Sequence, residues 1–545
     1  MSGETTEKKT FMRGVLVLIP AALFTKCVGL FYKIPLLFIV GVEGMAYFLA
    51  AYHVYSVLFV LSSTGLPSAL SLCVARAVAR GENRGLRRIL GVALLLFAGI
   101  GLGGTLFLML GAPTVARHLA MPDASAAIFA IAPSLFLAAF IGAVKGYFQG
   151  HRKMGSTALS EVLEASGKLG FGLWFALLAK GRGYAAPHIA AYAIFGITVG
   201  MALAAAVLLC CLLYHLAVQR AARCRLDGVA LPARCSIAGE LLRVALPITA
   251  SGGVMSLVSL LDTALICARL QCAGFAPEIA SAIYSSYGNL AIPLYNLVPS
   301  LLSPLTLALM PLLGASVGRG ELHAARGTLR TAVRICALVA IPATLGLAIF
   351  SVPLLELIFM GQSDAIRIAA PLLSVLALSV LPSTLLTLTG AALQALGHVW
   401  LPVAAMGAGA LLKLLCECVL LGTPGVYIFG APISTLACTL CVLIIEAVAL
   451  THILPFSILD AWDLFRPLLA SLPSVVLCAW IFLFCRARFG AQTWQMPVVL
   501  AVCVPTTLFL ALRLHALSAE DILALPAGDK ICRFLQKCKL LTADV

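Results

Sequence analysis

Charged residues are scarce in this sequence. Asp, Glu, Lys and Arg together make up 11% of its 545 residues, whereas hydrophobic residues make up 62%, and the mean hydropathy is +1.06. A water-soluble protein of this length has no core large enough to bury so many apolar side chains. The shortage of charge therefore excludes a soluble protein and indicates a polytopic membrane protein.

Several catalytic signatures are also missing. The chain has no Gly-x-x-x-x-Gly-Lys-Ser/Thr loop, which excludes a P-loop ATPase. Its nine histidines lack the spacing of metal ligands, so we expect neither a metal site nor a cofactor. The predicted outer loops are too short to hold the catalytic loop of a membrane glycosyltransferase or polymerase. We therefore predict that the protein is not an enzyme, and that ion gradients, membrane potential or substrate flux drive its work.

Long apolar stretches fill most of the chain. Fourteen of them are long enough to cross a bilayer as helices, which predicts an all-α membrane fold. They cover residues 14–38, 46–72, 89–111, 124–148, 158–179, 184–214, 240–267, 281–313, 331–352, 368–393, 399–421, 426–450, 466–485 and 496–514. Most of the eighteen cysteines lie inside these stretches, where Cys behaves as a small hydrophobe.

The net charge of +15 is concentrated in alternate connections. These basic clusters are Arg76, Arg80, Arg84, Arg87 and Arg88; Arg220, Arg223, Arg225 and Arg234; and Arg319, Arg326, Arg330 and Arg334. Such a pattern follows the positive-inside rule, so we expect the clusters and both termini to be cytoplasmic and do not expect nucleic acid as a partner. The first apolar run is too long for a signal peptide, which predicts an uncleaved helix.

An internal repeat divides the chain. Two short motifs occur twice. The motif Val-x-Arg-Gly-Glu occupies residues 78–82 and 317–321, with Gly at its second position in the later copy, and a Gly-His pair occupies residues 150–151 and 397–398. An even number of helices in each copy predicts a parallel repeat about an axis along the membrane normal. We therefore expect a six-helix lobe (1–219), a cytoplasmic linker (220–239), a second six-helix lobe (240–455), two additional helices (456–515) and a basic tail (516–545). The tail is predicted to be an amphipathic segment on the inner membrane surface, and a solvated tail is the close alternative.

Four lysines lie at membrane depth: Lys26, Lys33, Lys168 and Lys413. Each costs about 2.5–3.5 kcal/mol at the bilayer centre on insertion scales, so each is expected to face protein or water. Lys33 follows Lys26 by two helical turns and shares its face. Lys26, Lys168 and Lys413 are at similar depths on three helices and could converge on an anion such as phosphate, for which the compact ammonium group is suited.

Acidic residues at the same depth could neutralise these cations. Glu161 and Glu164 share one helical face with Lys168. Lys413 and Glu417 have the spacing of an ion pair within one helix, and that structural role is as well supported as a substrate role.

Three further polar residues, Asp262, Asn289 and Glu446, lie within the predicted helices. Asp262 could pair with Arg269 or face the cavity, and the sequence does not separate these alternatives. Asn289 needs a polar partner within a bilayer. Glu446 lies near the inner end of its predicted helix, and we expect it at the rim of the protein.

Short motifs along the chain resemble the stage V sporulation protein B family. The first helix carries Thr25-Lys26-x-x-Gly29-Leu30-x-Tyr32-Lys33-Ile34-Pro35, and similar motifs are Leu261-Asp262-Thr263, Arg269-Leu270-Gln271-x-Ala273-Gly274, Tyr287-Gly288-Asn289-Leu290, Asn296-Leu297-x-Pro299 and Lys145–Gly150. That family is related to lipid II flippases and polysaccharide exporters within the multidrug, oligosaccharidyl-lipid and polysaccharide flippase superfamily. The resemblance implies two six-helix lobes, a V-shaped central cavity and alternating access.

The resemblance also implies a lipid-diphosphate-linked sugar as substrate. The resulting hypothesis is a flippase of the cell membrane that moves an undecaprenyl-diphosphate-linked saccharide, a peptidoglycan precursor or polysaccharide unit, to the outer leaflet. Lys26 and Lys168, supported by Lys33, Lys413 and Asn289, would bind the substrate. Glu164, Asp262 and Glu417 would set the charge balance or bind a coupling ion of unknown identity, and membrane lipids would surround the protein. The alternative is a cation-coupled multidrug exporter of the same superfamily, which would favour an acid over two lysines in its first helix.

Overall fold

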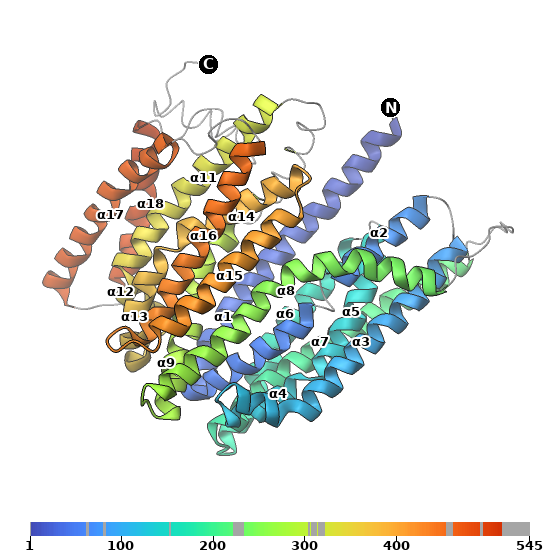
Figure 1. Ribbon diagram of the computed structural model, residues 1–545, viewed down its shortest axis with the longest axis horizontal. Coiled ribbons are helices and arrows are strands. Elements are labelled where there is room, and N and C mark those ends of the chain that lie inside the picture. The colour runs from blue at the N-terminus through green and yellow to red at the C-terminus, as the bar shows by residue number, and fades with distance from the viewer. Residues whose placement is uncertain are drawn as a thin grey trace. The chain divides into compact units, whose positions relative to one another are not determined.

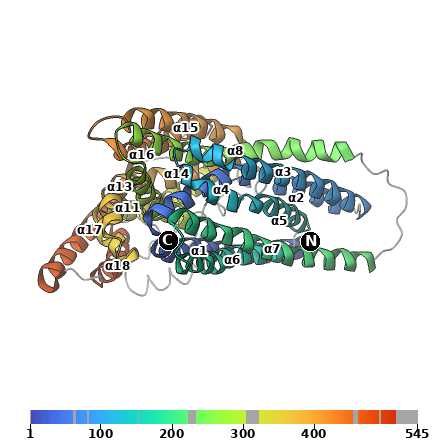
Figure 2. The same ribbon diagram turned by 90° about the horizontal axis from the view of Figure 1, so that it is seen from below.

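The computed structural model describes residues 2–60, 65–79, 83–151, 154–221, 234–302, 306, 313, 322–453, 461–490 and 494–514. These residues form helices and short connections, and no strand occurs among them (Figure 1, Figure 2). The predicted all-α class is therefore confirmed. By their internal contacts, the residues group into two compact units, Met1–Ser285 and Ser286–Val545, which we describe separately.

The first unit is built from helices α1 to α9. They are α1 (Ser2–Val60), α2 (Leu66–Ala79), α3 (Asn83–His118), the short η2 (Pro122–Ala124), α4 (Ser125–Ile131), α5 (Pro133–Gly150), α6 (Met154–Gly181), α7 (Ala186–Ala221), α8 (Arg234–Cys272) and α9 (Pro277–Ser286). Helix α8 packs against α1, α2 and α3 of this unit. The predicted boundary between the lobes at 220–239 stays a prediction, as does the superposition of the two repeats.

The second unit begins with a π-helical turn. Its elements are η3 (Tyr287–Ala291), the helical residues 292–302, α11 (Leu322–Ile349), α12 (Ser351–Ile358), α13 (Ser363–Ala377), α14 (Val380–Ala395), α15 (Trp400–Leu420), η4 (Tyr427–Phe429), α16 (Gly430–Ile453), α17 (Ala461–Phe489) and α18 (Gln495–Arg513). Helices α17 and α18 correspond to the two additional predicted helices. The basic tail lies outside the described residues.

The described residues contain eleven helices that are long and apolar enough to cross a membrane. A twelfth is formed if α13 and α14, which meet at a 48° bend, are taken as one span. The expected count of fourteen is thus not reached in this part of the chain. One reason is that α1, which covers residues of two expected stretches, contributes one counted span, Tyr32–Val60. Another is that residues 303–305 and 307–312 of the expected helix at 281–313 lie outside the described residues.

A glycine seam joins α6 to α7. A Cβ atom built on Gly196 would lie 2.3 Å from the Cα of Gly172, and one on Gly200 would lie 2.8 Å from the carbonyl carbon of Gly167. Only glycine allows the two backbones to approach this closely, as small residues commonly do between membrane helices. The seam also places Lys168, the neighbour of Gly167, at a fixed position relative to α7.

Helix α1 is interrupted at Gly41, whose φ of 80° lies in the left-handed region that glycine tolerates. A break of this kind leaves the carbonyl groups of the preceding turn without their helical donors. The side chain of Lys180, from the end of α6, donates a hydrogen bond of 3.0 Å to the carbonyl oxygen of Phe38. Lys180 therefore compensates for part of the interrupted hydrogen bonding and connects α1 to α6.

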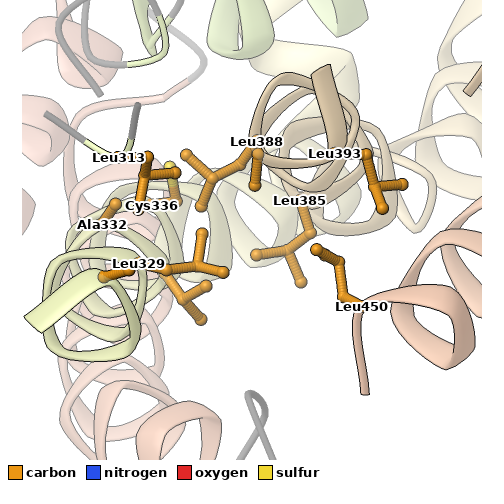
Figure 3. Close-up of a cluster of buried hydrophobic side chains, with 11 residues drawn as sticks. Leu313, Leu329, Ala332, Cys336, Leu385, Leu388, Leu393 and Leu450 are labelled. Atoms are coloured by element: carbon orange, nitrogen blue, oxygen red, sulfur yellow. The ribbon is translucent and has the colours of Figure 1, made fainter. Parts of the chain in front are cut away.

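The core of the second unit is a cluster of leucine-rich side chains from α11, α14 and α16. Figure 3 shows Leu329, Leu385, Leu388 and Leu450 pointing toward one another in this cluster. An ion-pair cluster attaches α17 to the same core, because Asp463 accepts hydrogen bonds from Arg330 at 2.6 Å and Arg334 at 2.8 Å. The carboxylate is only 5% exposed, so the two arginines compensate a charge that burial would otherwise disfavour.

Candidate functional site

The side chain of Lys168 lies close to two aromatic rings in the first unit. Its Nζ atom is 5.2 Å from the ring centre of Tyr32 and 5.0 Å from that of Tyr52, both on α1. A cation within about 6 Å of an aromatic face is attracted by the negative face of the ring. Tyr32 is held in place by a hydrogen bond of 3.4 Å from its hydroxyl group to the carbonyl oxygen of Ala193 on α7.

The local sequence explains why these rings fit beside α6. A Cβ atom on Gly172 would lie 2.6 Å from the hydroxyl oxygen of Tyr32. Gly172 follows Lys168 by one helical turn. Because Gly172 has no side chain, the Tyr32 ring can occupy the space beside it. The motif that contains Tyr32 and the glycines of α6 act together to position this lysine.

Lys33 adds a second positive charge to the same region. It follows Tyr32 on α1, its side chain is partly exposed, and the charge of Lys168 acts on it. Among the side chains that the structure describes, no carboxylate forms an ion pair with Lys33 or Lys168. Two cations at membrane depth without a carboxylate partner form a site that favours an anion.

Glu164, which shares a helical face with Lys168, is paired with a different lysine. Glu164 lies one turn before Lys168 on α6, but its Oε1 atom is 2.8 Å from Nζ of Lys145 on α5. Both side chains are largely buried, at 22% and 16% exposure. Lys145 was visible in the sequence only as part of a family motif. Its ion pair with Glu164 leaves the positive charge of Lys168 available.

Lys26 lies on the same helix as Lys33, seven residues earlier. Its backbone is helical within α1, but its side chain lies outside the described residues. The role predicted for Lys26 stays a prediction.

A hydrogen-bonded cluster joins α1, α8 and α9 elsewhere in the first unit. The Nδ1 atom of His53 lies 2.8 Å from the hydroxyl oxygen of Thr263 and 3.2 Å from that of Tyr284, and the two hydroxyl oxygens are 2.8 Å apart. Asp262 precedes Thr263 on α8 and does not form an ion pair with Arg269 in the described structure. Sequence analysis missed His53, because a single histidine without ligand spacing gives no signal.

The second unit contains the predicted pair within α15. Nζ of Lys413 lies 3.5 Å from Oε1 of Glu417, with side-chain exposures of 9% and 1%. The same oxygen accepts a hydrogen bond of 2.9 Å from Ser434 on α16. Of the two roles that the sequence left open for Lys413, the structure shows the ion pair, so Glu417 compensates the charge of Lys413.

This pair makes a testable contribution to stability. Replacing Lys413 by Met leaves Glu417 buried without its cation and is expected to cost about 3–5 kcal/mol, whereas replacing both residues by apolar ones is expected to restore most of that loss. Thermal unfolding in detergent of the single variants Lys413→Met and Glu417→Leu and of the double variant measures the coupling. A loss in the double variant equal to the sum of the two single losses would contradict a structural ion pair.

Asn289 and Glu446 are both buried in the second unit. Asn289 lies in the π-helical turn η3 and is 1% exposed; π-helical turns are frequent at functional sites, and the predicted substrate role of Asn289 stays a prediction. Glu446 on α16 is also only 1% exposed, and Thr389 on α14 lies within 2.5 Å of its Oε2 atom. The expectation of a rim position for Glu446 is therefore wrong, because α14 covers this face of α16.

These features were compared with known proteins. Residues 11–316, more than half of the chain, match the profile of the family described as Polysaccharide biosynthesis protein. The chain belongs to this family. Residues 280–419 also match the MatE family, and the two matched regions together cover residues 11–419.

Individual relatives agree with this assignment. The chain is 26% identical to Stage V sporulation protein B of Bacillus subtilis over 83% of its length and 85% of the relative. It is 28% identical to Lipid II flippase MurJ of the same organism over 28% of this chain and 30% of that protein. A solved structure of lipid II flippase MurJ in an inward closed conformation superposes with a TM-score of 0.68, covering 91% of this chain and 98% of that one at 14% identity, which shows a shared fold.

Proposed function

We propose that this protein is a flippase that moves a lipid-diphosphate-linked saccharide across the cell membrane by alternating access. The observation that carries the proposal is the pair of cations at Lys33 and Lys168, which no described carboxylate neutralises. A protein that binds an anion inside the membrane needs positive charge that remains available, whereas a purely structural protein has little reason to retain it. The similarity to stage V sporulation protein B and to a lipid II flippase supports this class of substrate.

The chemistry of the two lysines suits a diphosphate. Each ammonium group is a compact point charge with three donors, which binds phosphate oxygens without a fixed geometry. The rings of Tyr32 and Tyr52 hold the ammonium group of Lys168 without cancelling its charge, so its donors can turn toward a ligand. Lys413 contributes less to diphosphate binding in this proposal, because Glu417 already compensates its positive charge.

A cation-coupled multidrug exporter is the second candidate, and the MatE match favours it. Exporters of cationic drugs need negative charge in the binding region, since like charges repel at short distance. In the first unit, Glu164 is paired with Lys145, while Lys33 and Lys168 retain their charge. The charge distribution therefore favours the anionic substrate.

Rescue of cells depleted of their lipid II flippase tests the proposal directly. Expression of this protein is expected to restore growth, because it would return the diphosphate-linked precursor to the outer leaflet. A parallel assay in vesicles follows the movement of a polyprenyl-diphosphate saccharide and of a cationic dye. Transport of the dye alone would contradict the flippase proposal and support the exporter.

The predicted role of Lys26 gives a separate expectation. Lys26→Met keeps most of the side-chain length and removes the charge, so it is expected to lower transport about ten- to a hundredfold, the effect of losing one charged hydrogen bond. Lys26→Arg is expected to retain part of the activity. Normal transport by Lys26→Met, measured with equal amounts of protein in the membrane, would exclude Lys26 as a phosphate ligand.

A further inference from the structure

Glu446 is a buried carboxyl group inside a membrane-spanning helix. It lies in the span Tyr427–Ile453 and is 1% exposed. The hydroxyl oxygen of Thr389 on α14 lies 2.5 Å from its Oε2 atom. A Cβ atom on the next residue, Gly390, would lie 3.2 Å from its Oε1 atom, so the absence of a side chain there makes room for the carboxyl group.

Apolar residues flank Glu446 along α16 and Thr389 along α14. Leu388 and Leu393 on α14 and Leu450, one turn further along α16, belong to the leucine-rich cluster in Figure 3. Leu443, one turn earlier, packs against the same cluster. The carboxyl group therefore lies in a region of low dielectric constant, where an isolated charge is strongly disfavoured.

Charged groups on the neighbouring elements are engaged elsewhere or exposed. Helix α14 and η4 carry no charged residue. On α15, Lys413 and Glu417 pair with each other, and Glu417 also accepts a hydrogen bond from Ser434 on α16. Ser434 precedes Glu446 by twelve residues, which is about 18 Å along α16. The remaining charged groups and the histidine on α13 and α16, Asp364, Arg367 and His452, are exposed. The other titratable groups on α16 are the uncharged thiols of Cys438 and Cys441. Among the described residues, no cation pairs with Glu446.

The hydrogen bonds around Thr389 are consistent with a neutral carboxylic acid. The hydroxyl group of Thr389 lies 3.2 Å from the carbonyl oxygens of both Leu385 and Leu386. When Glu446 carries a proton, it can donate that proton to the Thr389 oxygen while Thr389 donates its own to a carbonyl oxygen of α14. Each group is then satisfied without a buried charge.

We propose that Glu446 and Thr389 form a proton-binding site within the second unit, and that the proton is the coupling ion of the transport cycle. The coupling role rests on the proposed transport function, whereas the proton site rests on the contacts described above. Glu446 lies seven residues before the end of α16 at Ile453, about 10 Å along the helix. The carboxyl group is therefore close to the helix end that the sequence predicts to be cytoplasmic, where water can supply and accept the proton.

Infrared spectroscopy of the purified full-length protein tests the proton site independently of transport. The carbonyl stretching band of a protonated carboxylic acid is expected at neutral pH, and Glu446→Gln is expected to remove its largest component. Thr389→Val is expected to shift that component, because the hydrogen bond is lost. Glu164→Gln serves as the matched control and is expected to leave it unchanged, since Glu164 is paired with Lys145. An unchanged band in Glu446→Gln would overturn the proton site.

Transport in vesicles with an imposed pH gradient tests the coupling. Movement of a polyprenyl-diphosphate saccharide by the unaltered protein is expected to follow the gradient, and Glu446→Gln, which keeps the side-chain size and a hydrogen bond to Thr389, is expected to lose that dependence. Transport by the unaltered protein that ignores the gradient would overturn the coupling role. If the unaltered protein moves no lipid-linked saccharide at all, the proposed function fails, while the infrared result still decides the proton site.

Discussion

Lys168→Met is expected to abolish transport while the protein still accumulates in the membrane. Methionine keeps most of the length of the lysine stem and removes the ammonium group, which loses its contacts with a diphosphate. One charged hydrogen bond corresponds to about 1.5–3 kcal/mol, so the expected loss of substrate affinity is roughly ten- to a hundredfold. Vesicle transport and rescue of flippase-depleted cells measure the effect at matched protein levels.

Two further variants separate charge from packing. Lys168→Arg keeps the charge and the attraction to the rings of Tyr32 and Tyr52, and it is expected to retain part of the activity. Arg182→Met removes an exposed cation just after α6 and is expected to transport normally. The thermal stability of Lys168→Met is expected to change little, because loss of the ring contacts is offset by removal of a charge from the membrane interior. Failure of this variant to accumulate would instead assign Lys168 a structural role.

Gly196→Leu is expected to prevent correct packing of the first unit. Its Cβ atom alone would lie 2.3 Å from both the Cα and the nitrogen of Gly172, and these are backbone atoms that cannot rotate away. Overpacking of an interior typically costs about 1–3 kcal/mol, and a clash between two backbones is expected to reach or exceed the upper end. The displaced α6 would also move Lys168 and the Tyr32 ring, so transport is expected to fall together with stability.

Gly170 provides a control on the same helix. A Cβ atom at this position meets no atom within 4 Å, and alanine favours a helix by up to about 1 kcal/mol relative to glycine. Gly170→Ala is therefore expected to melt at or above the temperature of the unaltered protein in detergent. If Gly196→Leu melts at the same temperature as Gly170→Ala, the close approach of α6 and α7 is wrong.

Local patterns in the sequence predicted local features well. Apolar runs of spanning length predicted the helical membrane fold, since every backbone polar group in a bilayer must be satisfied within a helix or a closed barrel. The spacing of Lys413 and Glu417 predicted their ion pair, because residues four apart in a helix are neighbours whatever surrounds the helix. The cation at Lys168 was also visible in the sequence, as a charge inside an apolar stretch.

The partners of residues on different helices were decided only by the tertiary structure. Glu164 has the same helical spacing from Lys168 as Glu417 has from Lys413, yet it pairs with Lys145 because α5 brings a second lysine within reach. Glu446 was expected at the rim from its position along its helix, but position along a helix does not reveal which neighbour covers it. Hydrophobicity and charge along the chain thus determined what crosses the membrane, whereas helix packing determined which charges are neutralised and which remain available for a ligand.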